Sequence, residues 1–335
     1  MNLEDLEKID SQKMCQTYDK WPEIAKQRYE QEFSRPECKD IDHIVVAGMG
    51  GSGTIGDVFS SILSKNNIHT SVVKGYLLPK TVDSNTLVVA TSIAGNTDET
   101  LTVLENSVKT NAKVIALSSG GKMEEVSSKN SIPYFKINQT HSPRASLLQF
   151  LYSTLNILQE FIPIKKADIT ESLSQLKNIQ KQICSSNLID DNPALNLAKW
   201  INTIPAIYYP AGLQSAAIRF KNSMQENAKS HAIAEDVIEA CHNGIVPWEK
   251  SSNIQPILIQ GKDDYIKTKE RWTVLKEFFQ KNNIEYKEVF SVDGNILTKI
   301  VCLIYFLDYT SIYRAVLSKL DPSPVQSIYY IKNRL

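Results

Sequence analysis

A short apolar run that ends in glycines and passes into a helical pattern most constrains how this chain can fold. Residues 43–48, HIVVAG, are rich in Val and Ile, and residues 53–65 carry apolar side chains at helical spacing. A run of this kind predicts a buried strand, and the spacing after it predicts a helix. The same strand–glycine–helix order recurs at residues 206–229. We therefore predict two similar α/β domains related by a weak internal duplication.

Strand and helix patterns alternate through both halves of the chain. Further strands are predicted at residues 70–75, 85–92, 112–119, 132–137, 205–212, 255–261 and 285–292. Further helices are predicted at residues 96–111, 142–161, 168–201, 213–230, 267–282 and 299–317. Continuous apolar strands that alternate with helices predict parallel sheets covered by helices on both faces. We expect domains at residues 1–165, with a polar leader, and 166–335.

Composition excludes several classes of protein. Lysine plus arginine and aspartate plus glutamate both number 37, so no net charge favours nucleic acid or an anionic membrane. The five cysteines form no C-x-x-C pair, which predicts reduced thiols in the cytoplasm rather than a disulfide framework or a zinc site. The acidic start of the chain does not resemble a signal peptide. Residues 299–317 are interrupted by Asp308 and hydroxyls, so we expect a buried helix there and no membrane span.

Gly48, Gly50 and Gly53 form a literal G-x-G-x-x-G pattern, which is typical of dinucleotide-binding turns. Such a site also needs an acidic residue at the end of the second strand, where this chain has Lys74. A P-loop needs a lysine where this chain has Thr54. Two readings remain, a tight turn without a ligand and a general anion site at a helix N-terminus.

A second turn of the same kind favours the anion site. Residues 91–100, TSIAGNTDET, join another predicted strand to another predicted helix, and Asn96 or Thr97 can cap that helix. Two such turns at the carboxyl ends of parallel strands can converge on one anion. Hydroxyls and backbone N–H groups without a lysine suit a phosphate monoester better than a triphosphate with magnesium.

Five segments together carry a resemblance to a known family. They are GMGGSGTIGD, SIAGNTDETL, SPRASL, NSMQENAKSH and EACHN, followed by the C-terminal DPSPVQSIYYIKNRL. From about residue 43 to the end, the chain resembles the sugar isomerase (SIS) superfamily, and within it the bifunctional phosphoglucose/phosphomannose isomerases. The resemblance implies two SIS domains, a homodimer, and interconversion of glucose 6-phosphate and fructose 6-phosphate. It also implies mannose 6-phosphate as a substrate of many members, and no metal or organic cofactor.

The resemblance implies a role for four residues in the isomerisation. Glu226 matches the base that moves a proton between C1 and C2, and His242 matches the histidine that opens the sugar ring. Arg144 matches the arginine that stabilises the enediolate, and Lys332 matches a lysine that assists ring opening. From the residues alone, each also fits a role without catalytic function. Glu226 could be a solvated helix carboxylate, His242 a structural histidine, Arg144 a surface arginine and Lys332 a lysine of the tail. A catalytic Lys332 would need a docked tail, and His242 could serve the neighbouring subunit's site.

The phosphate-binding positions of the family match Gly51, Ser52, Ser92 and Thr97. Here the chain departs from the family pattern, because Ile93 replaces an aromatic residue and Ala94 replaces a serine. Losing one hydrogen bond to a charged group costs about 1.5–3 kcal/mol. The change predicts weaker binding, a different phosphosugar, or compensation by Thr91 or water.

Two classes of function remain open. The presence of all four catalytic residue types favours an isomerase. Ala94 leaves a second class open, a protein that binds a sugar phosphate without converting it. A nicotinamide enzyme is disfavoured by the missing acid, and residues 1–42 show no helix-turn-helix of a transcription regulator. Glu239 and His242 have the spacing of a metal-binding pair, but no second pair completes a site.

Overall fold

The structure is a computed structural model that describes residues 1–334. The chain divides into two compact units. One consists of residues 20–173, and the other combines residues 1–19 with residues 174–335. The boundary expected from the sequence was between residues 165 and 166, with the leader in the first domain. In the structure the division falls within helix α8 (Lys166–Ile183), and residues 1–19 belong to the second unit.

The unit of residues 20–173 contains a parallel five-stranded sheet in the order β2-β1-β3-β4-β5. Its strands are β1 (His43–Ala47), β2 (His69–Val73), β3 (Thr86–Ser92), β4 (Lys113–Ser118) and β5 (Tyr134–Lys136). Its helices are α3 (Trp21–Glu30), α4 (Gly50–Leu63), α5 (Asp98–Ser107), α6 (Lys122–Lys129), the 3₁₀ turn η1 (Arg144–Ser146) and α7 (Leu147–Ile157). The prediction of five parallel strands in this half of the chain is confirmed.

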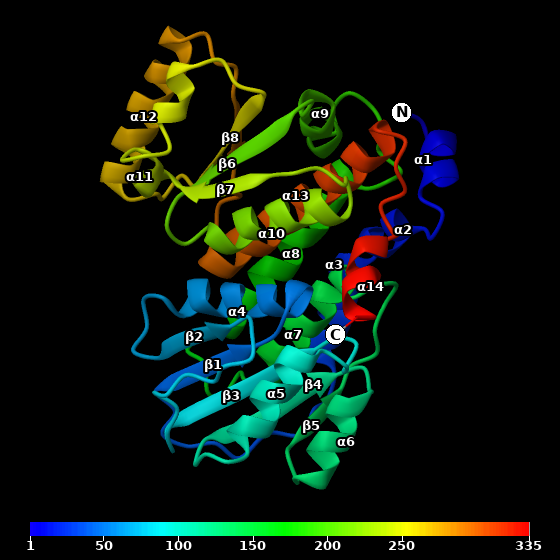
Figure 1. The fold of residues 1–335 in the computed structure, drawn as a ribbon, viewed down its shortest axis with the longest axis vertical. Coiled ribbons are helices and arrows are strands. Elements are labelled where there is room, and N and C mark those ends of the chain that lie inside the picture. The colour runs from blue at the N-terminus through cyan, green and yellow to red at the C-terminus, as the bar shows by residue number, and fades with distance from the viewer. Residues whose placement is uncertain (335) are drawn as a thin grey trace. The chain divides into compact units, whose positions relative to one another are not determined.

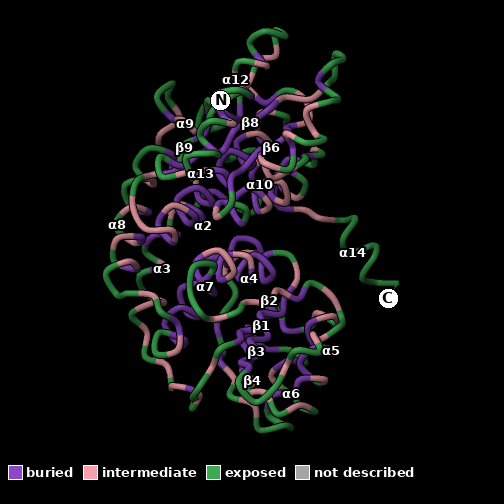
Figure 2. Tube along the Cα trace, turned by 90° about the vertical axis from the view of Figure 1, so that its left-hand side faces the viewer, coloured by how far each residue is buried: buried purple, intermediate pink, exposed green. Residues whose placement is uncertain are grey.

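Helices cover both faces of this sheet (Figure 1). On one face α4 packs on β1 and β2 and also contacts α7, while α5 and α6 cover the other face. Every residue of β1 and β3 is buried, as the continuous apolar runs predicted (Figure 2). Gly56 allows α4 to lie this close, because a Cβ there would stand 2.7 Å from a methyl group of Val72.

The second unit contains a parallel four-stranded sheet in the order β7-β6-β8-β9. Its strands are β6 (Ile204–Tyr209), β7 (Ile233–Asp236), β8 (Ile254–Gln260) and β9 (Lys287–Phe290). Its helices are α1 (Leu3–Ile9), α2 (Met14–Asp19), α9 (Pro193–Trp200), α10 (Gln214–Glu226), α11 (Val237–Ala240), the 3₁₀ turn η2 (Val246–Glu249), α12 (Ile266–Lys281), α13 (Ile296–Leu317) and α14 (Gln326–Lys332). Both units are therefore α/β domains with parallel sheets, which confirms the predicted duplication of the fold class.

Helix α13 is the central core helix of the second unit. It is long and apolar enough to cross a membrane by length and composition, yet 83% of its most apolar 18-residue window is buried inside the fold. The leader packs here, since the hydroxyl groups of Tyr305 and Tyr309 donate to the carbonyl oxygens of Tyr18 and Cys15, at 2.8 and 3.1 Å. These contacts explain why residues 1–19 belong to this unit.

Candidate phosphate-binding site and the placement of the catalytic candidates

The glycine-rich segment forms the first turn of α4, three residues earlier than predicted from the sequence. Gly50 has a φ of +51°, which a glycine adopts without strain. A Cβ at Gly48 would stand 2.9 Å from the carbonyl oxygen of Thr91, so this position also requires glycine. No side chain within residues 1–334 caps the helix at Met49. The first N–H groups of α4, including those of Gly51 and Ser52, are therefore available to an anion.

The second turn, between β3 and α5, is built in the same way. Gly95 has a φ of +74°, and a Cβ there would stand 1.7 Å from the carbonyl oxygen of Gly120. Thr97 occupies the N-cap position of α5, as the sequence allowed, but its side chain does not cap the helix. Its hydroxyl instead lies 2.9 Å from the hydroxyl of Ser92. This second helix N-terminus is thus also open to an anion.

A hydrogen bond joins the two turns. The amide N–H of Ile93 donates to the hydroxyl of Ser52 at 3.3 Å. Strands β1 and β3 are hydrogen-bonded neighbours, but the chain leaves β1 for β2 on one side and leaves β3 for β4 on the other. The two turns therefore meet at the switch point of the sheet, where parallel α/β folds bind ligands. The structure brings Gly51, Ser52, Ser92 and Thr97 to this edge of the sheet.

A third loop, which no motif described above indicated, supports the second turn. The amide N–H groups of Ser119 and Met123 donate to the carbonyl oxygens of Ile93 and Gly95, at 3.0 and 2.9 Å. The amide N–H of Lys122 donates to the side-chain oxygen of Asn96 at 3.0 Å. The glycine pair in SSGG, residues 118–121, was the signal for this tight packing. The hydrogen bonds from this loop fix the turn between β3 and α5 before any ligand binds.

Lys74, which stands where a dinucleotide site would have an acid, lies at the end of β2 beside the glycine-rich turn. Its ammonium is 2.6 Å from a carboxylate oxygen of Asp57 on α4. A Cβ at Gly53 would stand 3.1 Å from Cε of Lys74, so the lysine stem crosses α4 at this glycine. Burial raises the pKa of the Asp57 carboxyl, and Lys74 opposes part of that rise. The pair anchors the first turns of α4 to the sheet.

Ala94 and Thr91 have opposite surroundings. Ala94 is exposed, so a serine hydroxyl at this position would face solvent at the turn. Thr91 is fully buried, and its hydroxyl has no hydrogen-bond partner within residues 1–334. A buried hydroxyl of this kind does not replace an exposed one without movement of the turn.

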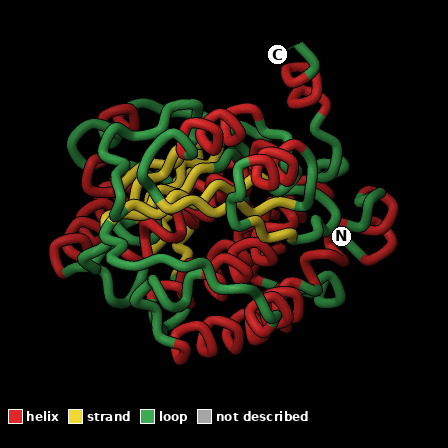
Figure 3. The backbone as a smooth tube through the Cα atoms, turned by 90° about the horizontal axis from the view of Figure 1, so that it is seen from below, coloured by secondary structure: helices red, strands yellow, loops and turns green. Residues whose placement is uncertain are grey.

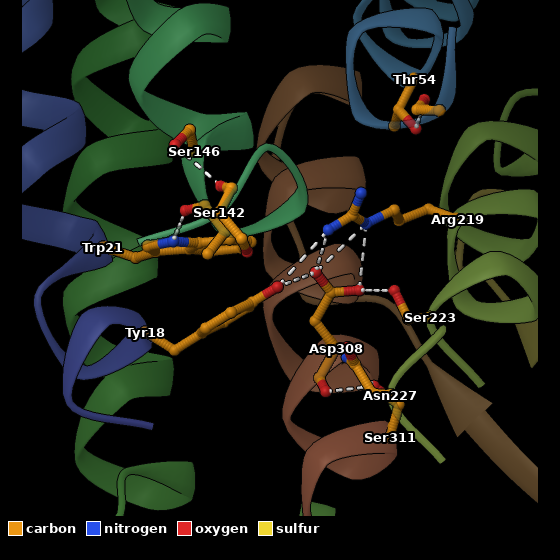
Figure 4. A network of polar contacts seen from close by, with 12 residues as sticks. Tyr18, Trp21, Thr54, Ser142, Ser146, Arg219, Ser223, Asn227, Asp308 and Ser311 are labelled. Carbon is orange, nitrogen blue, oxygen red and sulfur yellow. Dashed lines mark hydrogen bonds and ion pairs between the residues drawn. The ribbon is translucent and has the colours of Figure 1, made fainter. Parts of the chain in front are cut away.

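Arg144 begins η1 in the same unit, and its side chain is 5% exposed. This burial argues against the alternative that Arg144 is a surface arginine without catalytic function. The turn around it is fixed, because the Trp21 indole N–H donates to the carbonyl oxygen of Ala145 at 2.7 Å. The hydroxyl of Ser146 also lies within hydrogen-bond distance of two carbonyl oxygens, that of Ser142 at 3.0 Å (Figure 4) and that of Thr140 at 2.8 Å.

Glu226 is the last residue of α10, in the second unit. The preceding turns of this helix are fixed by the buried carboxylate of Asp308 on α13 (Figure 4). It accepts hydrogen bonds from Arg219 Nη2 at 2.7 Å, Ser223 Oγ at 2.5 Å and Tyr18 Oη at 3.0 Å. Burial alone would lower the pKa of Arg219, but Asp308, with smaller contributions from Tyr18 and Glu226, raises it above its ordinary value. The guanidinium therefore stays charged, and the ion pair positions the helix that carries Glu226.

His242 and Lys332 lie at exposed positions of the same unit. His242 follows α11, and its backbone N–H donates to the carbonyl oxygen of Glu239 at 2.8 Å. Lys332 ends α14, a helix that has no buried residue and projects from its domain (Figure 3). The docked tail that a catalytic Lys332 would need is therefore not seen within residues 1–334. The apolar residues of this helix are exposed: Ile328, Tyr329, Tyr330 and Ile331.

The predicted residues thus divide between the two units. Residues 20–173 hold the phosphate-binding candidates and Arg144, and the second unit holds Glu226, His242 and Lys332. No group of three or more His, Cys, Asp or Glu side chains that could hold a metal ion occurs in residues 1–334. All five cysteines are free thiols.

Comparison with known proteins also finds two domains in this chain. Residues 38–132 match the SIS domain, and residues 190–335 match the bacterial phospho-glucose isomerase C-terminal SIS domain. A bifunctional phosphoglucose/phosphomannose isomerase of Caldicellulosiruptor bescii is 32% identical over 312 residues, which cover 89% of this chain and 91% of that protein. A D-glucosamine-6-phosphate 4-epimerase of Sulfolobus acidocaldarius is 29% identical over 251 residues, which cover 73% of this chain and 77% of that protein.

The fold itself is known from solved structures. A crystal structure of a hypothetical protein from Thermus thermophilus superposes with a TM-score of 0.75 at 12% sequence identity, covering 98% of this chain and 92% of that one. At this identity the likeness concerns the fold alone. The chain is 32% identical to the Caldicellulosiruptor protein over 91% of that protein's length, and it has two SIS domains in this order. These findings show that the chain belongs to the bifunctional phosphoglucose/phosphomannose isomerase family.

Proposed function

We propose that this protein is an aldose–ketose isomerase that interconverts glucose 6-phosphate and fructose 6-phosphate. One observation carries the proposal: two helix N-termini without side-chain caps meet at the switch point between β1 and β3, and Ser52 joins them. A dianionic phosphate fits such a site, because it accepts backbone N–H bonds from both helices and lies at the positive end of both helix dipoles. Ser52, Ser92 and Thr97 add hydroxyl groups, and Gly51 adds an amide.

The reaction needs four further groups, and the chain supplies a candidate for each. In this proposal the Glu226 carboxylate takes the proton from C2 of the open-chain aldose and returns it to C1. Arg144 stabilises the negative charge that develops on the enediolate oxygens, which a guanidinium does without losing a proton. His242 and Lys332 act on the ring hydroxyl and ring oxygen during ring opening. The protein supplies every proton transfer, so the proposal involves no cofactor.

The working form that we propose is a homodimer. His242 and the apolar residues of α14 are exposed in the single chain, as expected for groups that a second copy covers. In such a dimer His242 would serve the site of the neighbouring subunit. Measurement of the molar mass in solution tests this part of the proposal separately from the chemistry.

A second candidate is an enzyme or a binding protein for another phosphosugar. Two observations favour it: Ala94 removes a hydroxyl from the phosphate turn, and the Sulfolobus relative is named as a D-glucosamine-6-phosphate 4-epimerase. A hydrogen bond to a charged group is worth about 1.5–3 kcal/mol, which corresponds to about ten- to hundredfold in affinity. Glucosamine 6-phosphate therefore belongs among the compounds to be tested.

The deciding experiment incubates the full chain with fructose 6-phosphate, without added metal or cofactor, and measures glucose 6-phosphate and mannose 6-phosphate. We expect glucose 6-phosphate to form, and mannose 6-phosphate production decides whether the second activity of the relatives is present. Glu226→Gln should remove turnover while substrate still protects the protein from thermal unfolding. Absence of turnover by the wild type would refute the isomerase, and full activity of Glu226→Gln would refute the mechanism.

A further inference from the structure

The side chain of Lys229 binds two segments that are far apart in the sequence. Its ammonium donates to the carbonyl oxygen of Glu226 at 2.9 Å, of Asp321 at 3.0 Å and of Pro322 at 3.2 Å. An ammonium has three N–H donors, so these three acceptors can use all of them. One acceptor belongs to the last residue of α10, and the other two belong to the segment that leads into α14.

Residues 227–230, which follow α10, fix its carboxyl end. Lys229 has a left-handed backbone with a φ of +53°, and the next amide, of Ser230, donates to the carbonyl oxygen of Met224 at 3.2 Å. The side chain of Asn227 donates to the hydroxyl of Ser311 on α13 at 2.9 Å. A cation at the carboxyl end of a helix also satisfies carbonyl oxygens that have no partner within the helix. Lys229 therefore closes the turn that carries Glu226.

Contacts fix the segment that leads into α14, but α14 itself has no buried residue. Pro322 and Ser323 are buried or nearly so, and the carboxylate of Asp321 accepts hydrogen bonds from the backbone N–H of Ser323 at 2.9 Å and from the hydroxyl of Ser11. In contrast, α14 has no buried residue (Figure 2). Within the single chain, the direction of α14, and with it the place of Lys332, is consequently set at residues 321–325.

We propose that Lys229 is a positioning residue that holds Glu226 and the root of the Lys332 helix in one fixed relation. The proposal rests on the isomerase function proposed above, in which Glu226 acts on C1 and C2 and Lys332 acts at the ring oxygen. The two groups then work on one sugar, so their relative place matters to well under 1 Å. A seven-residue helix is about 10 Å long, so a tilt of about 15° at its root moves its end by about 2.5 Å.

Hydrogen exchange of the full-length protein tests the structural part of the proposal directly. In Lys229→Met, which keeps the stem and loses the donors, exchange should rise about tenfold or more in peptides that cover residues 321–325 and residues 224–230. Lys319→Met is the matched control, because Lys319 is also an exposed lysine with a left-handed backbone, φ +59°, after a helix. It should leave exchange in both regions unchanged. Unchanged exchange in Lys229→Met would overturn the proposal.

Kinetics tests the positioning role. We expect Lys229→Met to lower kcat for fructose 6-phosphate by about tenfold or more and to change KM less than about threefold, because the phosphate turns belong to the other unit. Lys229→Arg should recover most of kcat, and Lys229→Gly, which eases the left-handed backbone, should resemble Lys229→Met. Raised exchange with an unchanged kcat would overturn the positioning role. An inactive wild type would refute the isomerase function instead, and the exchange result would still stand.

Discussion

The hydroxyl of Ser52 accepts a hydrogen bond from the amide of Ile93, and this contact joins the N-terminus of α4 to the turn before α5. Ser52 is 5% exposed and Ile93 is 2% exposed, so no bulk water replaces the contact. The same hydroxyl belongs to the proposed phosphate site. Its loss should therefore affect both the fold of the turn and the affinity for substrate.

We predict that Ser52→Ala raises KM for fructose 6-phosphate by about ten- to hundredfold, the value of one hydrogen bond to a charged group. Leaving the buried amide of Ile93 without a partner should also lower the free energy of unfolding by about 1–3 kcal/mol. Steady-state kinetics and urea unfolding measure the two effects. Ser64→Ala, at an exposed serine at the other end of α4, is the control and should change neither value. A wild-type KM in Ser52→Ala would contradict the proposed phosphate site.

Ala94→Ser should lower KM for the native phosphosugar by up to about tenfold, because it returns one hydrogen-bond donor to the phosphate turn. The side chain is exposed, so the extra hydroxyl needs no new space and the stability should stay within about 0.5 kcal/mol of wild type. Kinetics with fructose 6-phosphate and glucosamine 6-phosphate measures the effect. An unchanged or higher KM for both compounds would show that the missing hydroxyl has no part in binding.

Gly95→Ala should lower the free energy of unfolding by about 2 kcal/mol or more and raise KM. A left-handed backbone costs an L residue about 1–2 kcal/mol, and the new Cβ would also collide with the carbonyl oxygen of Gly120 at 1.7 Å. Gly75→Ala is the matched control, since a Cβ there would meet nothing within 4 Å. Equal unfolding midpoints for the two variants would contradict the rigid support that we assign to residues 118–121.

Much of the fold could be predicted because the strands of the first sheet are short apolar runs. In the second sheet, prediction of strands from apolar runs fails for one strand. No sequence pattern predicts strand β7, since Ile233–Asp236 has only two apolar residues, ends in two acids and lies at the sheet edge. The sequence of the leader indicates only a polar segment, although Leu6, Met14, Cys15 and Tyr18 are buried. Its few apolar residues become informative only when α13 is present for them to pack on.

The candidate site shows the same limit. The two glycine turns could be predicted because each needs backbone that only glycine adopts easily, and such positions stand out in a sequence. The contacts that fix the site join distant residues: Asp308 with Arg219, and Lys229 with Asp321. In the sequence Asp308 was visible only as an interruption of an apolar run. Its partners depend on how α10 packs on α13, which no local pattern contains.

His43, at the start of β1, predicts how stability depends on pH. Its Nδ1 lies 3.3 Å from the hydroxyl of Thr86, and its Nε2 lies 2.9 Å from the hydroxyl of Ser71. The Thr86 hydroxyl donates to Asp83 at 3.0 Å, so Nδ1 is the donor to Thr86. Burial, and then the neighbouring His69 at 4.9 Å between ring centroids, lower the pKa of His43 from its ordinary value of 6.5.

The sign of the pH effect follows from this lowered pKa. Well above pH 6.5 His43 is neutral in both states, so it adds no pH dependence to stability there. As the pH falls below 6.5, the unfolded chain takes up a proton before the folded one, and the free energy of unfolding falls until the folded pKa is passed. Urea unfolding at pH values between about 7 and 5 should therefore show a steeper loss of stability in wild type than in His43→Asn. His231→Asn, at an exposed histidine, is the control and should keep the wild-type slope. Equal slopes in wild type and His43→Asn would show that His43 takes up its proton equally well in both states.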